Sequence, residues 1–339
     1  MNDKISRFFE TIGQLESTDR VAIFTHQTPD PDALGAAVGV KWILKKQVNV
    51  EADIFYTGEI SHPQNKTMVN ILGIQTNKII DVDKDYDRNK YALAIAVDTT
   101  TDVPISVDYV IDHHRNKETK AEYIIDPVGA TCTIICEMIE QSGMVFDDDI
   151  DQCVATALLL GIKVDTDELV SETTTDRDYK ASQYLSAFVD RGKLSKITRY
   201  PLPGYILACE KVMYSAENNI ALQAGYVGFV GSISATQRDV IPYLADKMIR
   251  VDGIDTSIVF AIVNGSRIEG SVRSTNSAID VNDLCRELFN GGGKLGSGAG
   301  RVNLGFLEPA DFPDEDMETQ IVDMIKTKMF HKIKCAIEG

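Results

Sequence analysis

Acidic and imidazole side chains gather in four short stretches of the first half of the chain. The stretch VIDHHRN places two of the chain's five histidines side by side, between an aspartate and an arginine. The other three stretches supply further donors, and the full set is His26, Asp30, Asp32, Asp98, Asp112, His113, His114 and Asp165. Carboxylates and imidazoles without thiolate suit a hard or borderline divalent ion such as Mn²⁺ or Mg²⁺ better than a structural zinc. Two such ions about 3.5–4 Å apart commonly hydrolyse phosphate esters, so the pattern favours that reaction class.

These donors are expected at the ends of strands. Apolar, strand-like runs at 20–26, 49–58, 90–100 and 107–114 alternate with helical or turn segments. This alternation predicts an α/β fold with a doubly wound, mainly parallel sheet. Ligands bind such sheets beyond the carboxyl ends of the strands, where the donors of the first three stretches fall. The apolar run that ends at Asp165 is expected to bring a fourth segment to the same edge.

The turn in THQTPDPDALG is predicted to be stiff. Pro29 and Pro31 restrict the residues before them to extended backbone, so the carboxylates of Asp30 and Asp32 are held before any ligand arrives. Asp32 precedes a helical pattern and, taken alone, could instead be a helix N-cap. For His26, Asp30 and Asp32 together, a shared ligand is the better interpretation.

Length and charge limit the possible partners. At 339 residues the chain favours two domains, each large enough for its own core. A net charge of −17 would repel long polyanions, which argues against duplex nucleic acid and for short ligands. No apolar stretch approaches the ~20 residues that span a bilayer, and the amphipathic start lacks a signal-peptide core. A cytoplasmic protein without a membrane partner is therefore expected.

Four motifs of the chain resemble those of the DHH phosphoesterase superfamily, in the order that family has them. They are THQTPDPDALGAAVG, AVDTT, IDHHRN and LLLGIKVDTDELV. SVRS followed by FNGGGKLGSGAGRVNLGF is similar to the companion DHHA1 domain, so the resemblance covers nearly the whole chain. It implies a DHH metal-binding domain at 1–190, a linker at 191–215, and a smaller α/β DHHA1 domain at 216–339 across a cleft.

The resemblance also implies a two-metal centre. Mn²⁺ is the expected ion, with Mg²⁺ or Co²⁺ as alternatives, and Asp98 would bridge the two. The implied ligands are His26, Asp30 and Asp98 for one ion, and Asp32, Asp98, His113 and Asp165 for the other. His114 would face the scissile phosphate, while Asp112 would orient the neighbouring imidazoles.

Substrate contacts are implied in both domains. Arg115 could pair with a phosphate, although an exposed loop arginine is an equal interpretation. Glycine amides in the second domain would approach a ligand closely, next to a basic residue. The implied set is Arg115, Arg273, Gly291, Gly292, Gly293 and Lys294. Lys294 departs from the family, which commonly has histidine after the glycines, so a shift in recognition is expected there.

The expected function is a Mn²⁺-dependent phosphodiesterase, or oligoribonuclease, that cleaves short linear oligoribonucleotides to mononucleotides. Dinucleotides such as pGpG or pApA are the favoured substrates. A cyclic-dinucleotide phosphodiesterase and a phosphatase acting on 3′-phosphoadenosine 5′-phosphate are alternatives within the family. A nucleotide-sensing module without turnover is the alternative outside enzymes, and a homodimer is one option for the assembly.

Overall fold

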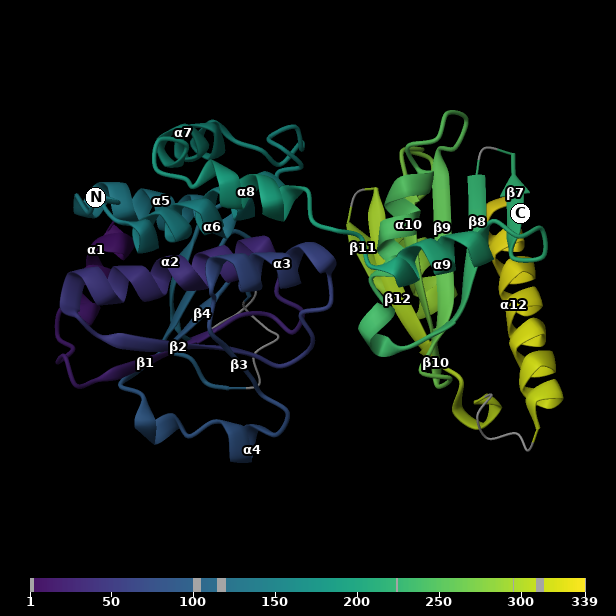
Figure 1. Ribbon diagram of the computed structural model, residues 1–339, viewed down its shortest axis with the longest axis horizontal. Helices are drawn as coiled ribbons and strands as arrows, with labels where there is room; N and C mark the ends of the chain where they lie inside the picture. Colours follow the sequence, from purple (N-terminus) through teal and green to yellow (C-terminus); the bar gives the residue numbers. More distant parts are fainter. Residues whose placement is uncertain are drawn as a thin grey trace. The chain divides into compact units, whose positions relative to one another are not determined.

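The computed structural model describes residues 3–99, 105–114, 120–223, 225–294, 296–308 and 314–338. These residues form two compact units, Met1–Pro201 and Leu202–Gly339 (Figure 1). The boundary between the units lies inside the segment expected to be a linker, at 191–215. Most of that segment is nevertheless helical, because α8 (Arg191–Thr198) belongs to the first unit and α9 (Gly204–Met213) to the second.

A six-stranded parallel sheet forms the centre of unit 1. Its strands are β1 (Arg20–Phe24), β2 (Glu51–Tyr56), β3 (Thr76–Lys78), β4 (Leu93–Val97), β5 (Tyr109–Asp112) and β6 (Glu122–Ile125). Their order, β3-β2-β1-β4-β5-β6, confirms the predicted doubly wound α/β fold. The strands β2 and β3 lie on one side of β1, whereas β4, β5 and β6 lie on its other side. The ends of β1 and β4 therefore flank the switch point, where such sheets bind ligands.

The helices of unit 1 cover the sheet unequally. A large apolar core joins β1, β4 and β5 to α2, α5 and α6 on one face. A smaller aromatic cluster around Phe24, Phe55 and Tyr86 covers the other face. The helices are α1 (Asp3–Ile12), α2 (Pro31–Val48), α3 (Pro63–Leu72), α4 (Val82–Asp85), α5 (Thr131–Ser142), α6 (Asp149–Asp165), α7 (Asp176–Leu185) and α8.

Glycines let α2 and α6 approach each other closely. A Cβ at Gly35 would lie 2.7 Å from the carbonyl oxygen of Ala157 on α6. A Cβ at Gly161 would lie 2.5 Å from Cys132 Sγ and 2.9 Å from the Cα of Asp32. Larger residues would push the helices apart, so these glycines hold the first turn of α2 against α6.

Unit 2 contains a second six-stranded sheet, of mixed direction. Its strands are β7 (Asn219–Leu222), β8 (Gly225–Ile233), β9 (Thr256–Val263), β10 (Arg267–Ser274), β11 (Gly292–Lys294) and β12 (Ser297–Asn303). They pair in the order β11-β12-β10-β9-β8-β7, in which only β8 and β9 are parallel.

Helices cover both faces of this second sheet, which confirms a second α/β unit. α9 and α10 (Val240–Met248) pack on one face, while α11 (Val281–Phe289) and α12 (Glu315–Glu338) pack on the other. Across the described parts of both units, no helix has the length and apolar character needed to cross a membrane.

We predict that Gly161→Ala lowers the free energy of unfolding by about 1–3 kcal/mol, because the added methyl group meets Cys132 and the backbone of α2. Urea unfolding followed by circular dichroism measures the change. Gly204→Ala is the matched control, since a Cβ at Gly204 would have no heavy atom within 4 Å. Equal stability of the two variants would show that the approach of α2 and α6 is not tight.

Candidate metal centre

Polar side chains from four segments of unit 1 meet at the carboxyl end of the parallel sheet. His26 follows β1, Asp98 follows β4, and His113 and His114 follow β5. Asp165 is the last residue of α6. The donor atoms form three overlapping groups, each with its atoms within 4.8 Å of one another: Asp98, Asp112, His113 and His114; His26, Asp30 and Asp98; and Asp32, His113 and Asp165.

Asp30 begins α2 as its N-cap. Its Oδ1 accepts hydrogen bonds of 3.0 Å from the backbone amides of both Asp32 and Ala33, and Pro31 occupies the first helical position. The N-cap considered for Asp32 is therefore wrong, because Asp30 has that role. The same Oδ1 lies 3.9 Å from Nε2 of His26, so the cap also orients a carboxylate toward an imidazole.

Asp32 caps a different helix. Its Oδ2 accepts from the Thr131 amide at 2.7 Å and its Oδ1 from the Cys132 amide at 2.8 Å, both in the first turn of α5. The N-cap position of α5 is Ala130, which has no side-chain acceptor of its own. Asp32 therefore supplies the missing acceptor, and its carboxylate interacts favourably with the positive end of the helix dipole.

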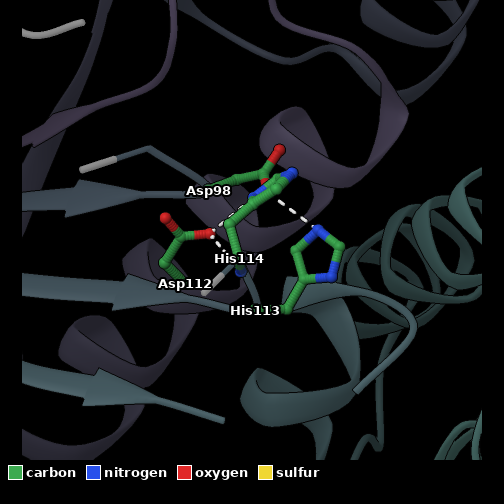
Figure 2. Close-up of side chains that lie close together, drawn as sticks. All are labelled: Asp98, Asp112, His113 and His114. Carbon is green, nitrogen blue, oxygen red and sulfur yellow. Dashed lines mark hydrogen bonds and ion pairs between the residues drawn. The ribbon is translucent and has the colours of Figure 1, made fainter. Parts of the chain in front are cut away.

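Asp98 belongs to two of the three donor groups, and Figure 2 shows it beside Asp112, His113 and His114. Its carboxylate oxygens lie 3.7 Å from His26 Nε2, 3.6 Å from His113 Nε2 and 3.7 Å from His114 Nδ1. The Thr131 hydroxyl donates a hydrogen bond of 3.0 Å to its Oδ1. Asp98 has a φ of 54°, a left-handed conformation that residues other than glycine seldom adopt. The backbone is thus strained at the residue whose carboxylate three imidazoles face.

His113 presents its Nε2 to the acids. Its Nδ1 lies 3.0 Å from the Val128 carbonyl oxygen, which can only accept, so Nδ1 carries a proton. Nε2 is buried, has no hydrogen-bond partner among the described residues, and lies 3.1 Å from Asp165 Oδ2. A metal-ligating imidazole commonly binds a backbone carbonyl through its other nitrogen in this way.

His114 is oriented differently from its neighbour. Asp112 is buried, and its Oδ1 lies 2.9 Å from His114 Nδ1 and accepts from the His114 amide at 3.1 Å. The side chain of His114 remains 56% exposed. Asp112 was expected to orient both imidazoles, but it contacts His114, while Val128 contacts the ring of His113. An exposed, oriented imidazole beside buried acids is suited to contact a ligand.

The electrostatics of this site call for cations. Burial, followed by the charges of Asp32 and Asp30, raises the pKa of Asp98 well above its usual range. Burial and the charge of Asp165 raise the pKa of Asp32 to about 6. Burial lowers the pKa of His113, but its contact with Asp165 and the charge of Asp32 outweigh this effect and raise it to about 9. The acids thus repel one another and hold protons where divalent ions would relieve the repulsion.

The donor set therefore fits hard or borderline divalent ions. It combines carboxylate oxygens with two imidazoles that contact Asp98 through Nε2, and the buried Nε2 of His113 also faces Asp165 at 3.1 Å. Cys132 lies close to the site, but its Sγ donates to the backbone oxygen of Asp32 at 3.3 Å. Burial raises the pKa of this thiol well above its usual range, which disfavours a thiolate ligand.

Sequence reasoning missed Thr131 and the Val128 carbonyl. Val128 lies between β6 and α5, and Thr131 is the first residue of α5, in a part of the chain that contains none of the recognised motifs. The available signal was the beginning of α5, where Ala130 provides no N-cap side chain. A helix that begins in this way requires an acceptor from elsewhere in the fold.

Arg273, in unit 2, is held by an acid. Its Nε donates to Asp246 Oδ1 at 2.5 Å and its Nη1 to Ser271 Oγ at 2.8 Å. Ser257 lies opposite Arg273 on β9, and its buried Oγ has no hydrogen-bond partner within the described ranges. Arg273 therefore lies in a polar row of the second sheet. Arg115 lies outside the described residues.

The glycine run has a packing role in addition to any contact with a ligand. A Cβ at Gly291 would lie 2.0 Å from the Ala299 oxygen, and one at Gly293 would lie 2.6 Å from the Ser297 oxygen. These two glycines allow β11 to lie against β12. Gly292 is less confined, with Asn282 Oδ1 at 3.3 Å from a Cβ placed there. Lys294 ends β11, where its backbone pairs with Ser297.

We predict that the metal-free protein loses stability as the pH rises from 5 to 7. The pKa of Asp32 is about 6 in the folded chain and near ~3.9 in an unfolded one. The stability that Asp32 contributes is therefore fully present below its pKa in the unfolded chain, and it is lost as the pH rises through about 6. Thermal unfolding in chelator measures the effect, and saturating Mn²⁺ should restore stability at pH 7.

Asp165→Asn is the control for this pH dependence, because it removes the charge that, after burial, contributes most to the raised pKa of Asp32. The metal-free variant should lose less stability than the wild type over the same pH range. A metal-free wild type whose melting temperature is unchanged or rises from pH 5 to 7 would contradict the repulsion inferred for these acids.

Comparison with known proteins relates part of the chain to a known family. Residues 20–162 match the model of the DHH family, N-terminal domain. An uncharacterized protein of Methanocaldococcus jannaschii is 31% identical over 334 residues, which cover 94% of this chain and 66% of that protein. A probable manganese-dependent inorganic pyrophosphatase of Bacillus licheniformis is 31% identical over 182 residues, which cover 50% of this chain and 55% of that protein. The chain thus spans between about half and two thirds of the length of these relatives.

A solved structure has a similar fold over the whole chain. The crystal structure of an exopolyphosphatase-related protein from Bacteroides fragilis has a TM-score of 0.69 and 16% sequence identity, and the match covers 98% of each chain. At this identity the likeness concerns the fold. The match at residues 20–162, which contain the donors that follow β1, β4 and β5, assigns this part of the chain to the DHH family.

Proposed function

We propose that this protein is a Mn²⁺-dependent phosphodiesterase that cleaves short linear oligoribonucleotides, above all dinucleotides such as pGpG or pApA, to mononucleotides. The observation that carries the proposal is the donor cluster around Asp98, in a chain whose residues 20–162 match the DHH family. Manganese is favoured because the donors are oxygens and imidazoles, and because several relatives are named as probable manganese-dependent enzymes.

Two ions are proposed, each with its own ligands. His26, Asp30 and Asp98 would hold the first ion, and Asp32, Asp98, His113 and Asp165 the second. Bound ions supply Lewis acidity, which polarises a phosphoryl oxygen and acidifies water. The protein's own part is to keep these donors in place. Hydrogen bonds from α5 to Asp32 and Asp98 and from His113 to Val128 do so without any ion.

His114 is the residue proposed to meet the scissile phosphate. Asp112 occupies Nδ1, so Nε2 is the ring atom that could donate a hydrogen bond to a phosphoryl oxygen. Because Asp112 is buried and also accepts from the backbone of His114, the ring direction is fixed before substrate arrives. Arg115 follows His114 in the sequence and could contribute a second positive group.

Unit 2 is proposed to recognise the terminal phosphate of a short nucleotide. Arg273 offers a guanidinium next to the hydroxyl of Ser271, and the glycines of β11 and Lys294 lie on a strand edge. Asp246 already binds Arg273, so an incoming phosphate would compete with a carboxylate. The net charge of −17 disfavours long polyanions, which supports preference for short substrates.

Inorganic pyrophosphatase is the second candidate. It is favoured by the curated relatives at about 30% identity, whose names give that activity as probable. Their matches reach 48–50% of this chain, so about half of the chain lies outside them. Cyclic-dinucleotide cleavage, hydrolysis of 3′-phosphoadenosine 5′-phosphate, and nucleotide sensing without turnover are the remaining candidates.

A substrate panel separates these candidates. With Mn²⁺, the protein should release mononucleotides from pGpG and pApA and act far more slowly on a 24-nucleotide RNA. Cyclic dinucleotides, 3′-phosphoadenosine 5′-phosphate and pyrophosphate complete the panel. Asp98→Asn should lose nearly all activity, because its amide cannot bridge two cations, and serves as the control for contaminating nucleases. Turnover of pyrophosphate alone, or equal rates on dinucleotides and the 24-nucleotide RNA, would contradict the proposal.

Lys294 gives a second test, at the position where the chain departs from the family pattern. If its ammonium binds the 5′-terminal phosphate, Lys294→Ala should raise KM for pGpG about tenfold, equivalent to ~1.4 kcal/mol. KM for GpG, which lacks that phosphate, should change far less. Steady-state kinetics on both substrates measure the difference, and an equal loss on both would remove Lys294 from the phosphate site.

A further inference from the structure

We propose that Arg177 and Asp178, adjacent residues of α7, are positioning residues for the candidate metal centre. They would act by fixing the loop at residues 126–130, between β6 and α5, and Thr131, the first residue of α5 that follows it. Neither residue belongs to any of the donor groups around Asp98. The inference rests on the proposed function in one respect, because it takes those groups to bind divalent ions.

The loop and Thr131 contact three of the proposed ligands. The Val128 carbonyl accepts from His113 Nδ1 at 3.0 Å. Where α5 begins, the Thr131 amide donates to Asp32 Oδ2 at 2.7 Å, and the Thr131 hydroxyl donates to Asp98 Oδ1 at 3.0 Å. A shift of this loop would therefore turn one imidazole and move two carboxylates at once.

Asp178 ties the middle of the loop to α7. Its side chain is fully buried, and its Oδ2 accepts from the Gly129 amide at 2.9 Å. Its Oδ1 accepts from the Thr133 hydroxyl at 2.5 Å, in the first turn of α5. The fit is close, since a Cβ at Gly129 would lie 2.8 Å from Asp178 Oδ2 and 2.5 Å from Thr166 Cγ2. One carboxylate thus fixes both the loop and the helix that follows it.

Arg177 ties the beginning of the loop. Its Nη2 donates to Asp126 Oδ2 at 2.9 Å and to Glu137 Oε2 at 2.5 Å, and its Nε donates to Glu137 Oε1 at 2.7 Å. Asp126 follows β6 and Glu137 lies on α5, so the guanidinium joins both flanks of the loop. The planar fork of arginine suits such a paired contact, which lysine cannot reproduce.

The bonds of Asp178 extend beyond the capping of its own helix. Within α7 it completes a capping box with Thr175, whose amide and hydroxyl both donate to Oδ2 at 2.7 Å. The bonds to Gly129 and Thr133 leave the helix and reach residues 49 and 45 positions away. An asparagine has one acceptor oxygen, and its NH₂ group can only donate. It therefore cannot accept all four hydrogen bonds that Asp178 accepts from Gly129, Thr133 and Thr175.

The test compares two buried side chains of unit 1. Asp178→Asn should weaken Mn²⁺ binding by about 10–100-fold, the range for partners that orient metal ligands. Trp42→Phe is the control, because Trp42 is 5% exposed, donates from Nε1 to Asp151 Oδ1 at 2.6 Å, and offers no metal ligand. It should lose stability but keep the wild-type affinity. Free Mn²⁺ is measured by electron paramagnetic resonance during titration of the full chain.

Two results would overturn the proposal. One is a folded Asp178→Asn protein that binds Mn²⁺ as the wild type does. The other is an equal loss of affinity in Trp42→Phe at equal loss of stability, which would reduce Asp178 to a general structural residue. If Asp178→Asn does not fold, Thr133→Val decides. It removes only the hydroxyl that donates to Asp178, and should weaken Mn²⁺ binding about fivefold. Wild-type affinity in that variant would then refute the proposal.

The outcome is independent of the substrate assignment. If the wild type does not cleave dinucleotides but Asp178→Asn loses Mn²⁺ affinity, the positioning role stands and the proposed substrate falls. If the wild type cleaves dinucleotides and Asp178→Asn binds Mn²⁺ normally, the substrate stands and the positioning role falls.

Discussion

The repulsion among buried carboxylates at the end of the parallel sheet is the constraint on which the rest of unit 1 depends. Asp98 and Asp32 are almost fully buried, and Asp30, Asp112 and Asp165 lie in the same overlapping donor groups. Such an arrangement costs free energy unless hydrogen bonds and cations compensate it. The amides of α5, the hydroxyl of Thr131 and the imidazole of His113 provide part of that compensation. Divalent ions would provide the remainder, which couples the stability of this unit to metal.

The fold could be predicted from the sequence wherever a strand is long and buried. β4 is buried at all five positions and β9 at all eight, and both contain uninterrupted apolar runs, at 93–97 and 258–263. β3 has the sequence TNK and no buried residue, so it carries no hydrophobic signal above that of a loop. The helical character of α8, inside the segment expected to be a linker, was also hidden. Ile197 is the only buried residue of α8, and proline residues follow the helix closely.

The donors of the site could be predicted because each follows an apolar run. The residues that hold these donors in place through hydrogen bonds could not be predicted. Asp30 and Asp32 both precede a helical pattern, and local sequence does not tell which one caps α2 and which one reaches α5. The link from Asp32 to Thr131 joins residues 99 positions apart, and that from Asp178 to Gly129 joins residues 49 apart. In unit 2, the glycines at 291 and 293 were attributed to ligand approach, but close packing against β12 also requires them. Such long-range requirements appear only once the fold is assembled.

The central claim is that the residues around Asp98 hold two divalent ions. Anomalous diffraction at the manganese edge, from crystals of the full chain grown with Mn²⁺, tests it most directly. The account predicts two peaks about 3.5–4 Å apart, one bound by His26, Asp30 and Asp98 and the other by Asp32, Asp98, His113 and Asp165. The absence of any peak at these residues, in crystals whose manganese concentration saturates binding in solution, would contradict the account.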